Sequence, residues 1–304
     1  MAAEGSKSAV VAALIGNSLI AVAKFVAAGI TSSAAMLAEA FHSVADAGNQ
    51  VLLLRGISVS EKAPSVRHPF GRGKEVYFWS LMVAVMLFVA GGVLAIQRGI
   101  DALQHPHEIS SFTTNFVVLG AAILIEGFTF RVAYRHFNKV RGSRGIWRSI
   151  RESKDSALLV VLLEDSAAML GLIFAVVGLA LAQATGNDYW DGIASITIGI
   201  LLGLVAVLLA TETRQLLVGE AAGRRDRAAM RMSVLSLPEV ESVGRLLTMH
   251  MGPDEILVNL EVDLADGLVD RRVEQVIDTI ESEIRKVLPG ANNIFVELQS
   301  RADG

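Results

Sequence analysis

The first 213 residues of the chain consist largely of long apolar runs separated by short polar stretches. Several runs contain about 20 or more residues with few charges, which is the length that a helix needs to cross roughly 30 Å of hydrocarbon. This pattern predicts six membrane-spanning helices. Their expected limits are residues 8–30, 33–59, 76–104, 112–136, 156–183 and 189–213.

A different pattern begins at residue 214, where charged and apolar residues are mixed. The segment RRDRAAMRMSVLSLP predicts a short amphipathic helix that Pro238 ends. SVGRLLTMHM and EILVNLEVDL alternate apolar and polar residues on either side of GPD, which is the signal of a β-hairpin. A helical stripe follows in VDRRVEQVIDTIESEIRKVLPG, and NIFVELQ predicts a last strand. Residues 214–304 are therefore expected to form a small soluble α+β domain with the order α-β-β-α-β.

Composition supports a membrane protein and limits the chemistry. Hydrophobic residues make up 52% of the 304 residues, which is high for a soluble domain. The fold class we expect is a polytopic α-helical membrane protein, with a transmembrane domain at residues 1–213 and the soluble domain after it. The chain has no cysteine, which excludes disulfides and thiolate metal sites. Any metal ion must be held by His, Asp or Glu.

Arginine and lysine are concentrated on one side of the predicted helices. The connections at about 55–75 and 131–154 are rich in both, whereas the connections on the other side carry only Arg98. The positive-inside rule then places both termini and the soluble domain in the cytoplasm. We expect a bacterial inner membrane or a plasma membrane. The basic stretch at 139–151 is expected to meet anionic lipid headgroups, and no nucleic-acid partner is expected.

Titratable residues inside the apolar runs are the candidates for chemistry. His42 and Asp46, in AEAFHSVADAGNQ, are four residues apart, so a helix presents both on one face. Glu164 and Asp165 lie in VVLLEDSAAMLG of the fifth span. Imidazole nitrogen together with carboxylate oxygen suits zinc and tolerates manganese, iron or cobalt. One or two carboxylates from a second helix would complete a four-ligand site.

An alternative is that these side chains only form hydrogen bonds within the bundle. However, the three acids of this group have no obvious intramembrane Arg or Lys to neutralise them. Each buried charge costs about 2.5–3.5 kcal/mol on insertion scales. A divalent cation, or protons in its absence, would offset that cost, so the pattern favours a cation site.

Two more ionisable residues lie within the apolar runs. Glu126, in ILIEGFTF of the fourth span, could line the same cavity. It could equally be a structural partner of Asn17, Asn49 or Arg131, and the sequence leaves both roles open. Lys24 in the first span is expected to reach an interface or to pair locally.

Two motifs resemble those of a known family. SSAAMLAEAFHSVADAGNQ resembles the second-span segment of the cation diffusion facilitator family, in which a His or Asp is followed four positions later by Asp. HPFGRGKE, residues 68–75, is similar to the loop that follows that span in the family. The resemblance implies a divalent metal/proton antiporter with six spans and cytoplasmic termini. It also implies a ferredoxin-like cytoplasmic domain that joins two protomers in a homodimer.

The resemblance also implies which ion and which ligands are involved. Zinc is expected first, with Mn²⁺, Fe²⁺, Co²⁺ or Cd²⁺ as alternatives, and no permanent cofactor is implied. In the family, the second and fifth spans each supply two ligands. His42, Asp46 and Asp165 carry over directly, whereas the fourth position falls on Val161, which cannot ligate. Glu164, about 100° around the helix from Asp165, is expected to replace it, with water as the alternative.

Other metal positions of the family are weakened in this sequence. In the 68–75 loop, His68 stands beside Arg67 and Arg72 and is expected to shape the loop rather than to bind an ion. The C-terminal domain has only one histidine, His250. We therefore expect no dinuclear site there, and a dimer that forms without cytosolic zinc.

The favoured function is export of a divalent metal ion in exchange for protons. A metal-binding membrane sensor or scaffold, which binds the ion without passing it, is the alternative. An intramembrane metalloenzyme is the third class. The chain has no H-E-x-x-H motif and no nucleophile beside a base in a recognisable motif, so we expect no enzyme.

Overall fold

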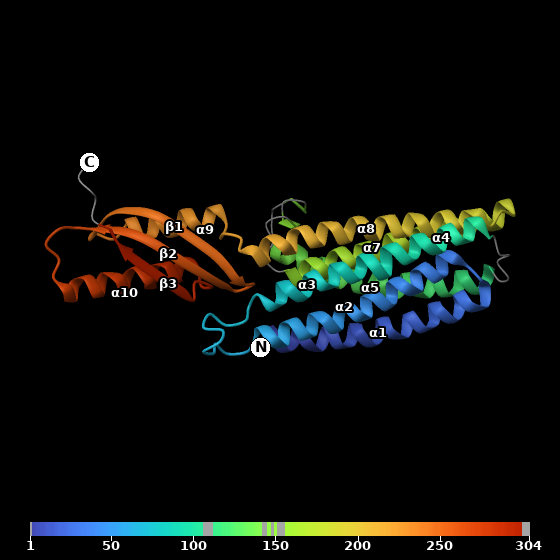
Figure 1. The fold of residues 1–304 in the computed structure, drawn as a ribbon, viewed down its shortest axis with the longest axis horizontal. Helices are drawn as coiled ribbons and strands as arrows, with labels where there is room; N and C mark the ends of the chain where they lie inside the picture. The colour runs from blue at the N-terminus through green and yellow to red at the C-terminus, as the bar shows by residue number, and fades with distance from the viewer. Residues whose placement is uncertain (1, 106–111, 142–144, 147–148, 151–155, 300–304) are drawn as a thin grey trace. The chain divides into compact units, whose positions relative to one another are not determined.

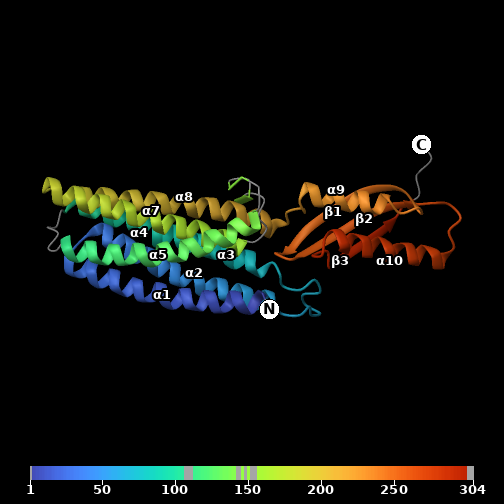
Figure 2. The same ribbon diagram turned by 180° about the vertical axis from the view of Figure 1, so that it is seen from behind.

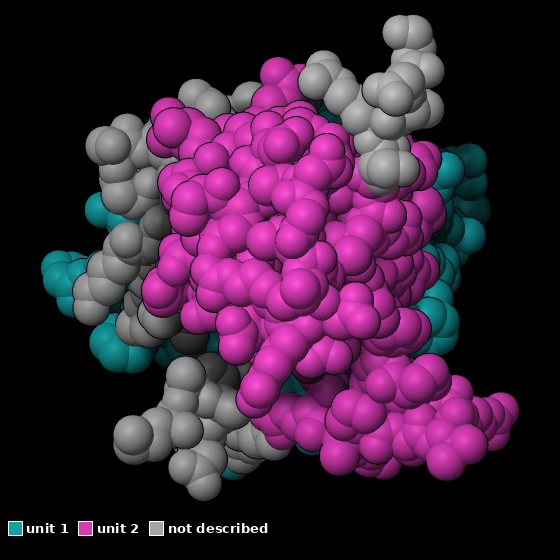
Figure 3. All heavy atoms as spheres, turned by 90° about the vertical axis from the view of Figure 1, so that its left-hand side faces the viewer, with its two compact units in different colours: residues 1–58, 76–214 teal, residues 59–75, 215–304 magenta. Residues whose placement is uncertain are grey.

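The computed structural model describes residues 2–105, 112–141, 145–146, 149–150 and 156–299. The chain divides into two compact units (Figure 3). The first contains residues 1–58 and 76–214, and the second contains residues 59–75 and 215–304.

The first unit is a bundle of long helices that lie side by side (Figures 1 and 2). One helical rod is interrupted by a π-helical stretch, η1, which separates α3 from α4. The bounds are α1 (Ala2–Thr31), α2 (Ala34–Ser60), α3 (Glu75–Met86), η1 (Leu87–Val93), α4 (Leu94–Gln104), α5 (Phe112–Arg141), α7 (Ser156–Thr185) and α8 (Tyr189–Val218).

A helix is present in each of the six predicted regions, but several are longer than expected. For example, α5 continues to Arg141 rather than ending at 136, and α8 continues to Val218 rather than 213. The reason is that an apolar run predicts the part of a helix that suits hydrocarbon, and it does not predict where the helix itself ends. The backbone hydrogen bonds of a helix continue through residues such as Glu212 and Arg214, which are good helix formers.

Within the described part of the chain, four helices are long and apolar enough to cross a membrane. They are Leu14–Thr31, Glu75–Gln104, Leu159–Thr185 and Tyr189–Val218, with a shorter apolar helical stretch at Phe112–Phe128. The second predicted span is not among them, because α2 carries the polar residues of the candidate site along its length.

The interior of the bundle is apolar and closely packed where α4 crosses α8. A Cβ atom at Gly99 would lie 2.7 Å from the carbonyl oxygen of Gly192, so the two backbones are in direct contact. The opposite case holds on the outside, where large apolar side chains such as Leu19 and Leu204 are exposed. Small residues inside and large apolar residues outside are the arrangement expected of helices surrounded by lipid.

The second unit contains a three-stranded sheet covered on one face by two helices. Its elements are α9 (Arg224–Leu235), β1 (Val240–Gly252), β2 (Glu255–Leu264), α10 (Asp270–Val287) and β3 (Asn293–Leu298). The central strand β2 pairs antiparallel with β1 and parallel with β3. This order is the α-β-β-α-β order that the sequence pattern predicts.

Alternation along the strands separates a core face from an open face. Val258 and Leu260 of β2 are buried with Ile280 of α10. On the open face, Leu247 of β1 and Phe295 of β3 both pair with Asn259 in the register, and they remain 57% and 49% exposed. The loop at 59–75 belongs to this unit and brings Phe70 edge-on to Phe295, with ring centroids 6.4 Å apart.

Candidate metal site

The candidate site is built on α2, whose start is fixed by two serines. Ser32 has a φ of +57°, in the left-handed region, and it turns the chain between α1 and α2. Ser33 then caps the helix, because its hydroxyl oxygen accepts a hydrogen bond from the backbone N–H of Met36 at 3.1 Å. The same hydroxyl donates to Asp191 of α8 at 2.6 Å. These contacts anchor the helix that carries His42 and Asp46.

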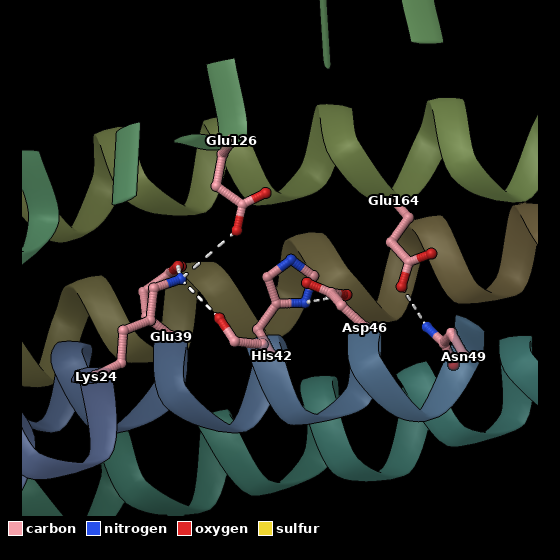
Figure 4. Close-up of polar contacts among 8 residues, drawn as sticks. Lys24, Glu39, His42, Asp46, Asn49, Glu126 and Glu164 are labelled. Atoms are coloured by element: carbon pink, nitrogen blue, oxygen red, sulfur yellow. Dashed lines mark hydrogen bonds and ion pairs between the residues drawn. The ribbon is translucent and has the colours of Figure 1, made fainter. Parts of the chain in front are cut away.

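His42 and Asp46 meet on one face of α2, as their spacing predicts (Figure 4). Nδ1 of His42 lies 3.4 Å from Oδ1 of Asp46, and the two side chains are 0% and 4% exposed. Neither ring nitrogen of His42, nor Oδ1 of Asp46, has a hydrogen-bond partner among the residues that the structure describes. Buried polar atoms in native proteins are nearly always satisfied by protein, water or an ion. This pair therefore has unused capacity to bind.

Glu164 of α7 joins the pair from the neighbouring helix. Its Oε1 accepts a hydrogen bond from Nδ2 of Asn49, which lies one turn beyond Asp46 on α2. Its carboxyl group lies near that of Asp46 (Figure 4). The structure thus brings together an imidazole and two carboxyl groups from two helices, all of them buried.

Asp165 and Val161 occupy the other positions that the sequence analysis considers on α7. Val161 packs against the apolar core of the bundle. Asp165 is only partly buried, and the described residues include no contact between it and His42 or Asp46. Over the part of the chain that the structure describes, no three His, Asp or Glu side chains are grouped as ligands of a single ion. The four-ligand set therefore stays a prediction.

The sequence analysis does not name Glu39, and it names no partner for Lys24. Nζ of Lys24 lies 3.1 Å from Oε2 of Glu39, 2.8 Å from the hydroxyl of Ser43 and 4.0 Å from Oε1 of Glu126. Lys24 of α1 therefore pairs locally, which is one of the two roles considered for it, with acids of α2 and α5 other than Asp46, Glu164 and Asp165. Glu39 precedes His42 by three positions, so the helical face rule could have identified it.

Glu126 has a different neighbour from those considered in the sequence analysis. Its carboxylate faces Lys24, whereas Arg131 is exposed and Asn49 binds Glu164. It lies in the same buried polar row as His42 and Asp46 (Figure 4). Both functional and structural roles for it remain compatible with this position.

The remaining histidines lie in different settings. His68 closes a tight turn with Ser65, where each backbone N–H donates to the other residue's carbonyl at 2.9–3.0 Å. His250 lies on the core face of β1 and is 4% exposed.

Much of the predicted lipid-facing basic stretch, including Arg144 and Arg148, lies outside the described residues.

Comparison with known proteins gives the family. Residues 10–218 match the family model described as the cation efflux transmembrane domain. The chain is 33% identical over 288 residues to "Proton-coupled zinc antiporter SLC30A9, mitochondrial" of Xenopus laevis, a match that covers 93% of this chain and 52% of that protein. It is 34% identical over 270 residues to "Metal tolerance protein C4" of Arabidopsis thaliana, covering 87% and 58%.

A more distant relative matches over nearly its whole length. The "Manganese efflux system protein MneP" of Bacillus subtilis is 20% identical over 299 residues, covering 96% of this chain and 95% of that protein. By contrast, the chain spans about half the length of the zinc antiporters that it matches. The Xenopus relative is named as an antiporter and the Bacillus relative as an efflux protein, and none of the three names is that of an enzyme. The apolar helices and the family match make the chain an integral membrane protein, and it belongs to the cation diffusion facilitator family, as the motifs in its sequence suggest.

Proposed function

We propose that the protein is a secondary transporter that moves divalent metal cations out of the cytoplasm in exchange for protons, with zinc as the preferred ion. The observation that carries this proposal is the buried pair of His42 and Asp46, whose binding atoms lack partners among the described residues, beside the carboxyl group of Glu164. Family membership supports metal transport, and the name of the Xenopus relative supports zinc and proton coupling.

In this proposal the ion binds to the imidazole of His42 and to the carboxylates of Asp46 and Glu164. Nitrogen with oxygen ligands suits zinc and also admits manganese, cobalt and iron. Asn49 orients Glu164 through its amide, as partners behind a metal ligand commonly do. Asp165 is the proposed fourth ligand and would have to turn inward when the ion arrives.

Proton exchange follows from the two neighbouring carboxyl groups. Two buried carboxyl groups that lie close together repel each other when both are charged, so one of them retains a proton when no cation is bound. Metal ligands must be deprotonated, so binding of the ion releases that proton. Protons arriving from the other side of the membrane would then displace the ion. Coupling of this kind needs a gradient and no nucleotide.

The direct-contact crossing of α4 and α8 supports a moving bundle. Glycines such as Gly99 and Gly192 let the two backbones approach closely at the crossing. Rocking of helices at such a crossing would expose the site first to one side and then to the other. The proposal includes six spans, with α2 and the whole of α5 among them.

Assembly and orientation are further parts of the proposal. We expect both termini on the cytoplasmic side and a homodimer formed through the C-terminal unit. The exposed Leu247 and Phe295 on the open face of the sheet favour such pairing. A bacterial inner membrane or a plasma membrane remains the prediction for location, although the Xenopus relative is named as mitochondrial.

Metal flux into proteoliposomes under an imposed pH gradient tests the proposal. Zinc, manganese, iron, cobalt and cadmium would be compared for the wild type, Asp46→Ala and Glu164→Ala. Asp101→Ala, an exposed acid at the end of α4, is the matched control. We expect gradient-dependent zinc flux that Asp46→Ala abolishes and Asp101→Ala preserves. Zinc binding that depends on Asp46 without any flux would favour the sensor or scaffold instead.

A further inference from the structure

Lys24 holds a position that is unusual for a charged residue in a membrane bundle. Its side chain is 0% exposed, and its ammonium group contacts Glu39 and Ser43 of α2 and faces Glu126 of α5 (Figure 4). A buried ion is tolerated only when it is paired and hydrogen-bonded. Lys24 therefore acts as the resident cation of a pair of carboxylates contributed by two helices.

The carboxylate pair is more than a partner for the lysine. The Oε2 atom of Glu39 bonds Lys24 at 3.1 Å, whereas Oε1 of Glu126 stands 4.0 Å away, beyond a direct hydrogen bond. The other oxygen of Glu39 has no hydrogen-bond partner among the described residues. It lies against Gly171 of α7, where there is no room for a Cβ atom. Two carboxyl groups, one from α2 and one from α5, therefore share one ammonium group.

This cluster lies next to the candidate metal site along α2. Glu39 precedes His42 by less than one turn, and Ser43, which binds Lys24, follows His42 directly. Two carboxylates this close to the proposed site would attract a divalent cation themselves if no positive charge stood between them. Carboxylate oxygens suit manganese, magnesium and calcium, whereas imidazole nitrogen suits zinc.

We propose that Lys24 is a specificity-determining residue of the transporter. Its ammonium group occupies the carboxylate pair of Glu39 and Glu126 and prevents that pair from taking up a divalent cation. The ion is thereby directed to the imidazole and carboxylates around His42. This inference rests on the proposed function, because it assigns a role beside the same transport site.

The test is the number of divalent ions that the purified full-length protein binds, measured by calorimetry with Mn²⁺ and with Zn²⁺. Lys24→Met removes the charge and keeps an unbranched side chain of similar length. Lys24→Gln also removes the charge and retains a hydrogen-bond donor, so it serves where the methionine variant does not fold. Lys24→Arg keeps the charge and is the matched control.

We expect each neutral variant to bind one more Mn²⁺ per protomer than the wild type. We also expect the Mn²⁺ affinity to rise by roughly tenfold or more, as removal of a nearby unit charge in a protein interior implies. The rise should be larger for Mn²⁺ than for Zn²⁺, because the vacated position offers only carboxylate oxygens. Lys24→Arg should match the wild type. Adding Glu39→Gln to a neutral variant should remove the extra ion.

An unchanged number of ions and an unchanged Mn²⁺ preference in both neutral variants would overturn the assignment, and Lys24 would then be a structural partner only. An extra ion that persists after Glu39→Gln would overturn it too. The readout does not depend on flux. If the wild-type protein moves no metal, the proposed transport function is wrong. An extra ion that depends on Glu39 would still show, in that case, that Lys24 occupies a cation-binding position.

Discussion

Asn49 of α2 donates a hydrogen bond to the carboxylate of Glu164 on α7. This bond joins α2 to α7 and holds Glu164 on the side of Asp46 (Figure 4). Glu164 therefore faces α2, whereas Val161, one turn before Asp165, packs against the apolar core.

Removing the Asn49 amide should weaken metal binding. Asn49→Leu takes away the donor that orients Glu164, and loss of a partner behind a metal ligand typically costs about 10–100-fold in affinity. Zinc affinity measured by competition with a chelating dye would detect this. Gln50→Leu, which changes the adjacent amide on another side of α2, is the control and should remain within about threefold of the wild type. Equal affinities for all three proteins would exclude this role for Asn49.

The cap of α2 should contribute to the stability of the bundle. Ser33→Ala removes the hydroxyl that caps the helix and that donates to the buried Asp191. Loss of a cap and of a buried hydrogen bond costs about 1–3 kcal/mol. Thermal unfolding in detergent should show a lower midpoint for Ser33→Ala than for Ser18→Ala, whose hydroxyl is exposed and bonds only to its own helix. Identical midpoints would contradict the prediction.

The crossing of α4 and α8 should not accept a methyl group. Gly99→Ala places a Cβ atom 2.7 Å from the carbonyl oxygen of Gly192, so the helices must move apart, at a cost of about 1–3 kcal/mol. Gly120→Ala, where the new atom meets open space on α5, should stabilise the helix by up to about 1 kcal/mol. Unfolding midpoints that shift in opposite directions would support the direct-contact crossing. An unchanged unfolding midpoint for Gly99→Ala would show that the crossing has room for a methyl group.

The second unit should lose stability in acid through Glu261. The backbone N–H and the guanidinium group of Arg245 both donate to this carboxylate, which holds its pKa below the ordinary value of 4.5. Because the folded-state pKa is the lower one, the stabilisation is complete above about pH 4.5 and is lost as the pH falls through the folded-state pKa. Hydrogen exchange of β1 and β2 amides, corrected for intrinsic rates, should accelerate below that pH.

Glu261→Gln is the control for this pH dependence. The glutamine cannot titrate, so the exchange of the β1 and β2 amides should lose the component that depends on pH in this range. Arg245→Met should reduce this component only in part, because the backbone N–H of residue 245 still donates to Glu261. If the wild type and Glu261→Gln have the same pH profile, the stabilisation does not come from this pair.

Local features of the candidate site were predictable from the sequence, whereas contacts between helices were not. The spacing of His42 and Asp46 places them on one face wherever the helix lies, so their meeting follows from the sequence alone. The pairing of Lys24 with Glu126 depends on which faces of α1 and α5 turn towards each other. That orientation is set by tertiary packing, which a single sequence does not specify.

Element type was likewise easier to predict than the detail within an element. The apolar run at 76–104 predicts one continuous helix, and the structure divides it with the π-helical stretch at Leu87–Val93. A π-helix changes the hydrogen-bond pattern without changing the hydrophobicity of the run, so the apolar pattern carries no sign of it. In the second unit, alternation predicts the strands, but the parallel pairing of β3 with β2 requires the fold.

The most direct test of the account is a simultaneous record of zinc and proton movement in the same proteoliposomes. A zinc-sensitive dye and a pH-sensitive dye would be enclosed together, with the wild type, Asp46→Asn and Asp101→Asn compared. The account predicts that zinc and protons move in opposite directions in the wild type and in Asp101→Asn, and that Asp46→Asn abolishes both movements. Zinc flux without proton movement, or full exchange by Asp46→Asn, would contradict it.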